Sequence, residues 1–118
     1  MYAYDVSADS ISGSWHLLDA SASGQGAADR IDLRLVARDG LLRGTATHRS
    51  TGDEMMLASA MFDGSTLRAQ MMAPPSRRQA DMPWLVMTAI GPRFEGHWRN
   101  QDGETVGPKL KMIRAIVS

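Results

Sequence analysis

The chain has 118 residues, of which 43% are hydrophobic, and its 13 Lys and Arg balance 13 Asp and Glu, so its formal net charge is zero. This length predicts one domain over residues 1–118, with 1–11 as an N-terminal segment, and a core large enough to fold without metal or disulfide staples. The sequence has no cysteine, which excludes disulfide frameworks and thiolate sites. The balanced charge, with no basic run beyond Arg77-Arg78, argues against nucleic acid as a partner.

Targeting signals and membrane spans are not evident in the sequence. The first twenty residues lack the charged and apolar regions of a secretory signal. No stretch approaches the roughly 18 apolar residues of a membrane-spanning helix. We therefore expect a cytoplasmic protein with no membrane span.

Short segments of alternating polarity lie between turn signals that recur about every ten residues. In 30–35, for example, Ile31, Leu33 and Leu35 share one parity, and charged residues occupy the other. This period of two is typical of strands with one buried face. The sequence predicts eight strands, at approximately residues 12–20, 29–38, 41–50, 54–63, 65–73, 82–91, 93–99 and 105–117.

Regular short strands with local turns predict an all-β fold, an eight-stranded antiparallel up-and-down β-barrel, with a two-sheet sandwich as the alternative. The connections after the second, fourth and sixth strands are tight, as at Asp39-Gly40. Those after the first, fifth and seventh strands are longer, at 21–28, 73–81 and 100–104. Because consecutive strands alternate in direction, the long loops should share one end, an open mouth above a floor of tight turns.

Gly13-Ser14-Trp15 opens the first predicted strand. On these residues and the strand layout, the sequence resembles the calycins, the group of small barrels that includes lipocalins, fatty-acid-binding proteins and avidins. In that group the Gly-x-Trp closes the barrel floor, and in lipocalins a basic residue of the last strand packs across the Trp. The resemblance implies that Arg114 packs on Trp15, a cation–π contact of about 0.5–2 kcal/mol.

The inward parity, extended to the mouth, predicts a pocket that is polar on one side and apolar on the other. A few polar groups in an apolar concavity are typical of small-molecule sites. Nine Met residues suggest an adaptable interior. The expected ligand-binding residues are Met71, Trp84, Trp98, His48 and Arg78.

Catalysis at the mouth would depend on His48 as general base, positioned by Asp19 or Asp29. Both carboxylates flank the 21–28 loop, however, where Asp commonly caps a turn through its own backbone. We expect no metal, because the three His lack metal-ligand spacing. We also expect no cofactor, because no dinucleotide or Walker motif occurs.

The predicted barrel and its mouth residues suggest three functions. The leading expectation is a barrel that binds an apolar or amphipathic small molecule at its open end. The alternatives are a cofactor-free isomerase, hydratase or cyclase acting on an apolar intermediate, and an interaction module with a filled core. The interior volume discriminates between them.

The fourth and sixth predicted strands are apolar on both parities. With the outer face of the fifth strand, which ends in Met72, they should form one apolar patch that includes Leu85 and Met87. A large patch of this kind usually marks an interface, so we expect a homodimer through the fourth to sixth strands. Alternatively, the 73–81 loop or residues 1–10 cover the patch.

Overall fold

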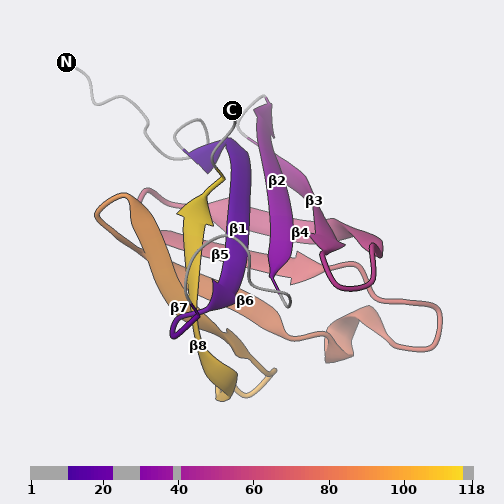
Figure 1. The fold of residues 1–118 in the computed structure, drawn as a ribbon. Coiled ribbons are helices and arrows are strands. Elements are labelled where there is room, and N and C mark those ends of the chain that lie inside the picture. The colour runs from indigo at the N-terminus through magenta and orange to yellow at the C-terminus, as the bar shows by residue number, and fades with distance from the viewer. Residues whose placement is uncertain (1–10, 23–29, 39–40, 116–118) are drawn as a thin grey trace.

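The computed structural model describes residues 11–22, 30–38 and 41–115 (Figure 1). The chain forms eight strands close to the predicted ranges and one short 3-10 helix. They are β1 (Gly13–Asp19), β2 (Ile31–Arg38), β3 (Leu41–His48), β4 (Glu54–Phe62), β5 (Thr66–Met71), η1 (Gln79–Asp81), β6 (Trp84–Ile90), β7 (Arg93–Arg99) and β8 (Thr105–Arg114). Over the described ranges, no helix has the length and apolar character needed to cross a membrane.

The strands close into a barrel in which each pairs antiparallel with the next, and β8 returns to β1. This confirms the all-β, up-and-down barrel, and the two-sheet sandwich is wrong. Figure 1 shows β4 and β5 crossing behind β1 and β2 at a steep angle. Such crossing follows from the strand tilt that closure of a small barrel requires.

Alternating side chains from the strands fill the barrel with one hydrophobic cluster. The predicted inward parity is correct for Leu33 and Leu35 on β2 and for Leu67 and Met71 on β5, which are all buried. Ile11, at the end of the predicted N-terminal segment, is buried in the same cluster. The sixteen buried members are Ile11, Trp15, Leu17, Leu33, Leu35, Leu42, Ala46, Leu67, Ala69, Met71, Met82, Leu85, Met87, Phe94, Leu110 and Met112.

The predicted parity of β6 is wrong. Leu85 and Met87 are both 0% exposed, so they face the core and not an external patch. Their β5 partners are the buried Ala69 and Leu67, and paired residues share a face of the sheet. Trp84, one position before Leu85, therefore lies on the outer wall. Because both parities of β6 are apolar, the alternation could not determine which one is buried.

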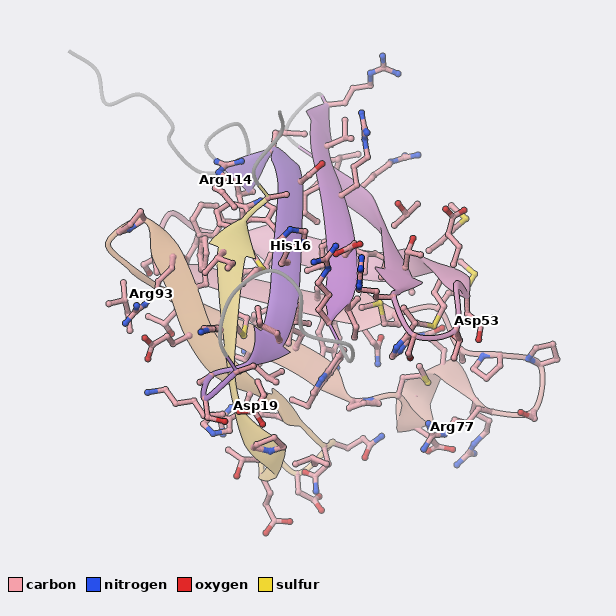
Figure 2. The ribbon with its side chains drawn as sticks, in the orientation of Figure 1. His16, Asp19, Asp53, Arg77, Arg93 and Arg114 are labelled. Carbon is pink, nitrogen blue, oxygen red and sulfur yellow. The ribbon has the colours of Figure 1, made fainter. Side chains whose placement is uncertain are left out.

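The floor of the barrel is closed where Arg114 of β8 pairs with Trp15 of β1. The Arg114 Cζ lies 4.1 Å from the centroid of the Trp15 ring, so the contact that the resemblance implies is present. The indole Nε1 donates to the Ile11 carbonyl over 2.8 Å, and Phe94 meets the ring edge-on at 5.4 Å. Figure 2 shows Arg114 and Asp19 at opposite ends of the barrel.

The backbone conformation and the surroundings of residue 13 explain why a glycine stands two positions before Trp15. Its φ is +126°, a conformation that L side chains rarely adopt. A Cβ at this position would also lie 2.7 Å from Arg114 Nη1, which donates to the Ser12 carbonyl. Glycine therefore lets the guanidinium lie across both the backbone and the indole.

We predict that Gly13→Ala lowers the free energy of unfolding by about 2–3 kcal/mol, because it adds backbone strain and crowds Arg114. Gly52→Ala is the control, since its φ is also positive at +77° but its Cβ would meet nothing within 4 Å. That variant should lose about 1 kcal/mol. Urea denaturation checks both values, and equal losses would contradict a special role for Gly13.

Candidate functional site

The seam between β3 and β4 is the shortest of the barrel. Only Thr45, Ala46 and Thr47 of β3 have register partners on β4, namely Met56, Met55 and Glu54. Residues 41–44 of β3 continue beside β2 but have no partner on β4. A register shift between Leu57 and Ser59 bends β4 at the same level. The two strands therefore separate toward the floor end.

A hollow of about 400 Å³ occupies this opening in the wall. Among its lining residues, Arg43 and Ser59 are polar and the others have apolar side chains or none, and backbone groups add further polar surface. Glycine is required at position 44, because a Cβ there would clash with the Arg34 carbonyl oxygen of β2 and lie 3.2 Å from Leu57 Cδ1. The lining residues are Leu41, Leu42, Arg43, Gly44, Met56, Leu57, Ala58, Ser59 and Ala60.

A second hollow, of about 420 Å³, adjoins the first on the outer face of the β2–β3 hairpin. It is lined by Val36, Arg38, Leu41 and Arg43, so Leu41 and Arg43 belong to both hollows. Leu41 is 58% exposed, which is unusual for an apolar side chain of its size. No carboxylate of the described residues forms a salt bridge with Arg38 or Arg43. The wall thus combines apolar surface with unneutralised positive charge.

Of the residues predicted for catalysis, the structure describes Asp19 and His48, and no hydrogen bond or ion pair joins these two. The Asp19 carboxylate accepts hydrogen bonds from the Ser21 backbone N at 2.8 Å and from Ser21 Oγ at 2.7 Å. These two bonds hold the pKa of Asp19 below its ordinary value. The arrangement is that of the turn-capping alternative. No hydrogen bond or ion pair joins the His48 ring to another described side chain, and Asp29 lies outside the described residues.

The residues predicted for ligand contact lie in three different places. Met71 is buried in the core, and Trp98 packs against the core while partly exposed. Trp84 is on the outer wall, beneath Arg68. Arg78 is exposed on the loop between β5 and β6 and pairs with Asp81 at 3.1 Å. They do not form one pocket at the mouth.

The 73–81 loop covers part of the outer face of β5. Gln70 is buried beneath this loop. Its Nε2 donates to the Met82 carbonyl at 2.9 Å and to the Gln79 carbonyl at 3.2 Å. The Gln79 side chain in turn accepts from the Ala73 N and donates to the Met71 carbonyl, each over 2.8 Å. This loop therefore covers one end of the patch predicted for association.

Sequence reasoning gave no role to a polar network on the outside of β1 and β2. His16 is buried, and its Nδ1 lies 2.8 Å from Asp32 Oδ1, which also accepts from Arg30 Nε at 2.9 Å. The alternation placed His16 and Asp32 outward, but only the register pairs them. The network ties β1 to β2. The described residues contain no cluster of three or more His, Asp or Glu that could hold a metal.

We predict that Asp32→Ala lowers the free energy of unfolding by about 2 kcal/mol, because buried His16 and Arg30 both lose an acceptor. Asp53→Ala removes an exposed carboxylate that makes no ion pair with a described residue, and it should change stability by less than about 0.5 kcal/mol. Urea denaturation compares the two variants. Equal stability of both would show that the network contributes nothing.

Comparison of the chain with known protein families, with curated proteins and with solved structures finds no match. The barrel architecture therefore follows from the structure alone.

Proposed function

We propose that the protein binds an amphipathic small molecule, an apolar chain with an anionic head, in the opening between β3 and β4. The observation that carries the proposal is the 400 Å³ hollow with one arginine at its rim. This volume lies within the range of about 300–1,000 Å³ that is usual for small-molecule sites. The proposal retains the expected class of ligand but moves it from the mouth to the wall.

The buried cluster in the interior is the reason for placing the ligand in the wall. The barrel axis is occupied by the hydrophobic cluster, which includes Met87 and Met112 at 0% exposure. In the opening, by contrast, Leu57 is only partly buried and Met56 is 59% exposed. An apolar chain laid against them would remove this surface from water, at about 0.8 kcal/mol for each buried CH₂.

Arg43 supplies the polar end of the proposed site. A guanidinium matches a carboxylate in a bidentate geometry, and Arg43 has no competing carboxylate within the described ranges. Arg38 lines the adjoining hollow and adds a second positive charge. A fatty acid of medium length fits this combination of apolar groove and cationic rim.

We further propose that the barrel is calycin-like. Closure of eight strands in sequence order supports this, as does the packing of Arg114 over the Trp of Gly13-x-Trp15. The proposal concerns architecture and implies no particular ligand, because the groups that share this barrel bind different molecules.

The binding test uses cis-parinaric acid, a fluorescent fatty acid, and its uncharged methyl ester. The wild-type protein should bind the acid saturably. Arg43→Gln should weaken acid binding about fivefold, corresponding to about 1 kcal/mol for an exposed charge pair, and leave the ester unchanged. Ala58→Phe should weaken both ligands by at least about tenfold, because the ring would fill the hollow.

Two matched variants serve as controls. Arg49→Gln removes an exposed arginine that is not part of the hollow, and Thr88→Phe adds a ring to the outer face of β6. Both should bind like wild type. Absence of saturable binding, or an Ala58→Phe variant that binds both ligands normally, would refute the wall site.

We still predict a homodimer through the outer face of β4 to β6, but Leu85 and Met87 are buried and cannot belong to the interface. Exposed methionines favour it: Met56 and Met72 lie side by side, joined by a 2.8 Å bond from the Met72 N to the Met56 carbonyl. They are 59% and 50% exposed, and Met61 on the same wall is 54% exposed. The partner of Met61 on β5 is Arg68, whose side chain lies on the same face of the sheet.

We expect light scattering at micromolar concentration to give twice the chain mass of 12.9 kDa. Met61→Glu and Met72→Glu should shift the protein toward the monomer, since each places a charge in the apolar contact. Val106→Glu, at a residue of β8 that is 45% exposed, is the control. A wild-type monomer, or a dimer that neither Glu variant dissociates, would contradict this interface.

A further inference from the structure

The outer wall formed by β5, β6 and β7 carries a third hollow, separate from the proposed fatty-acid site. It has a volume of about 340 Å³, and Trp84 is part of its lining. The Trp84 side chain has Gln70 of β5 as one cross-strand neighbour and Arg99 of β7 as the other. The remaining lining comes from Arg68, Val86 and the 100–103 turn. No residue of this hollow lines the opening between β3 and β4.

Two arginines flank the indole. The Arg68 Cζ lies 5.8 Å from the centroid of the Trp84 ring, and Arg99 is directly opposite Trp84 in the register. Neither guanidinium forms a salt bridge with a carboxylate of the described chain. Side chains directly opposite on one face have Cβ atoms about 5 Å apart, so Arg99 is within reach of any group resting on the indole.

The rim of the hollow is held in place by both neighbouring loops. Gln101 Nε2 donates to the Ala80 carbonyl at 2.8 Å, which ties the β7–β8 turn to η1. Arg99 Nη1 donates to the Gly103 carbonyl at 2.8 Å, and this leaves its other donors available. The Asn100 Oδ1 accepts from the backbone N of Asp102 and of Glu104. A fixed rim reduces the entropy lost when a ligand binds.

We propose that this hollow binds a planar aromatic anion, such as an aromatic carboxylate. The ring would stack on Trp84, and the carboxylate would lie between the Arg99 and Arg68 guanidinium groups. Stacking on an indole requires a flat π-face, which an aliphatic acid lacks, and two arginines select for negative charge. The shape and charge of this site thus favour a different class of ligand from that proposed for the wall opening.

The test uses 2-naphthoate as the probe and follows the three Trp indole N–H signals of the full chain by NMR. The Trp84 signal should shift saturably, while the signal of Trp15, buried at the floor, stays in place. Trp84→Ala should weaken naphthoate binding at least about tenfold, and Arg99→Gln about fivefold. Uncharged 2-naphthamide should bind about fivefold more weakly than naphthoate.

Controls separate this site from the wall opening. Arg49→Gln and Arg43→Gln should both bind naphthoate like wild type, and excess decanoate should not displace it. Circular dichroism confirms that the variants are folded, and Arg99→Gln provides an independent result if Trp84→Ala does not fold. Absence of a saturable Trp84 shift, unchanged affinity in Arg99→Gln, or displacement by decanoate would overturn the proposal. Each of these results leaves the parinaric acid experiment unaffected.

Discussion

The fold depends on the contact between its first and last strands, where Arg114 lies over the Trp15 ring at 4.1 Å. Arg114 reaches Trp15 because β8 is antiparallel to β1 and paired with it in register. Gly13 provides the space for the guanidinium, and Ile11 and Ser12 accept hydrogen bonds from Trp15 and Arg114. Closure removes the free edges that an open sheet of eight strands would expose. It also determines which end of the barrel is sealed.

Neighbouring strands of the closed barrel are not all paired over the same length. The β2–β3 seam has eight register pairs, whereas the β3–β4 seam has three, the fewest in the barrel. Because large side chains such as Met87, Leu85 and Met112 are buried in the interior, the proposed ligand would gain most from surface that the strands leave uncovered. The opening between β3 and β4 provides such surface beside Arg43. The filled core thus provides the rigid support, and the incomplete seam provides the proposed site.

Much of this architecture could be predicted from the sequence, because turns and alternation are local signals. The eight strands and their order depend on those signals and on chain direction, whereas the resemblance to calycins implied the Trp15–Arg114 contact. The orientation of Trp84 could not be predicted, because both faces of β6 are apolar and the register with β5 decides between them. The β3–β4 opening and the His16–Asp32 pair also depend on register, which a single sequence specifies poorly. Of the residues predicted for the mouth, Trp84 lies on the outer wall and Asp19 caps its own turn.

The central claim is that the ligand enters through the wall and not through the mouth. Paramagnetic relaxation enhancement with a doxyl-labelled fatty acid tests it most directly, since the nitroxide broadens the NMR signals of amides close to it. The account predicts selective broadening at Gly44, Ala58 and Ala60, which line the opening. It also predicts little effect at Ala22 and Gln101, which follow β1 and β7 at the other end of the barrel. Selective broadening at Ala22 and Gln101, with Gly44 and Ala58 unaffected, would contradict it.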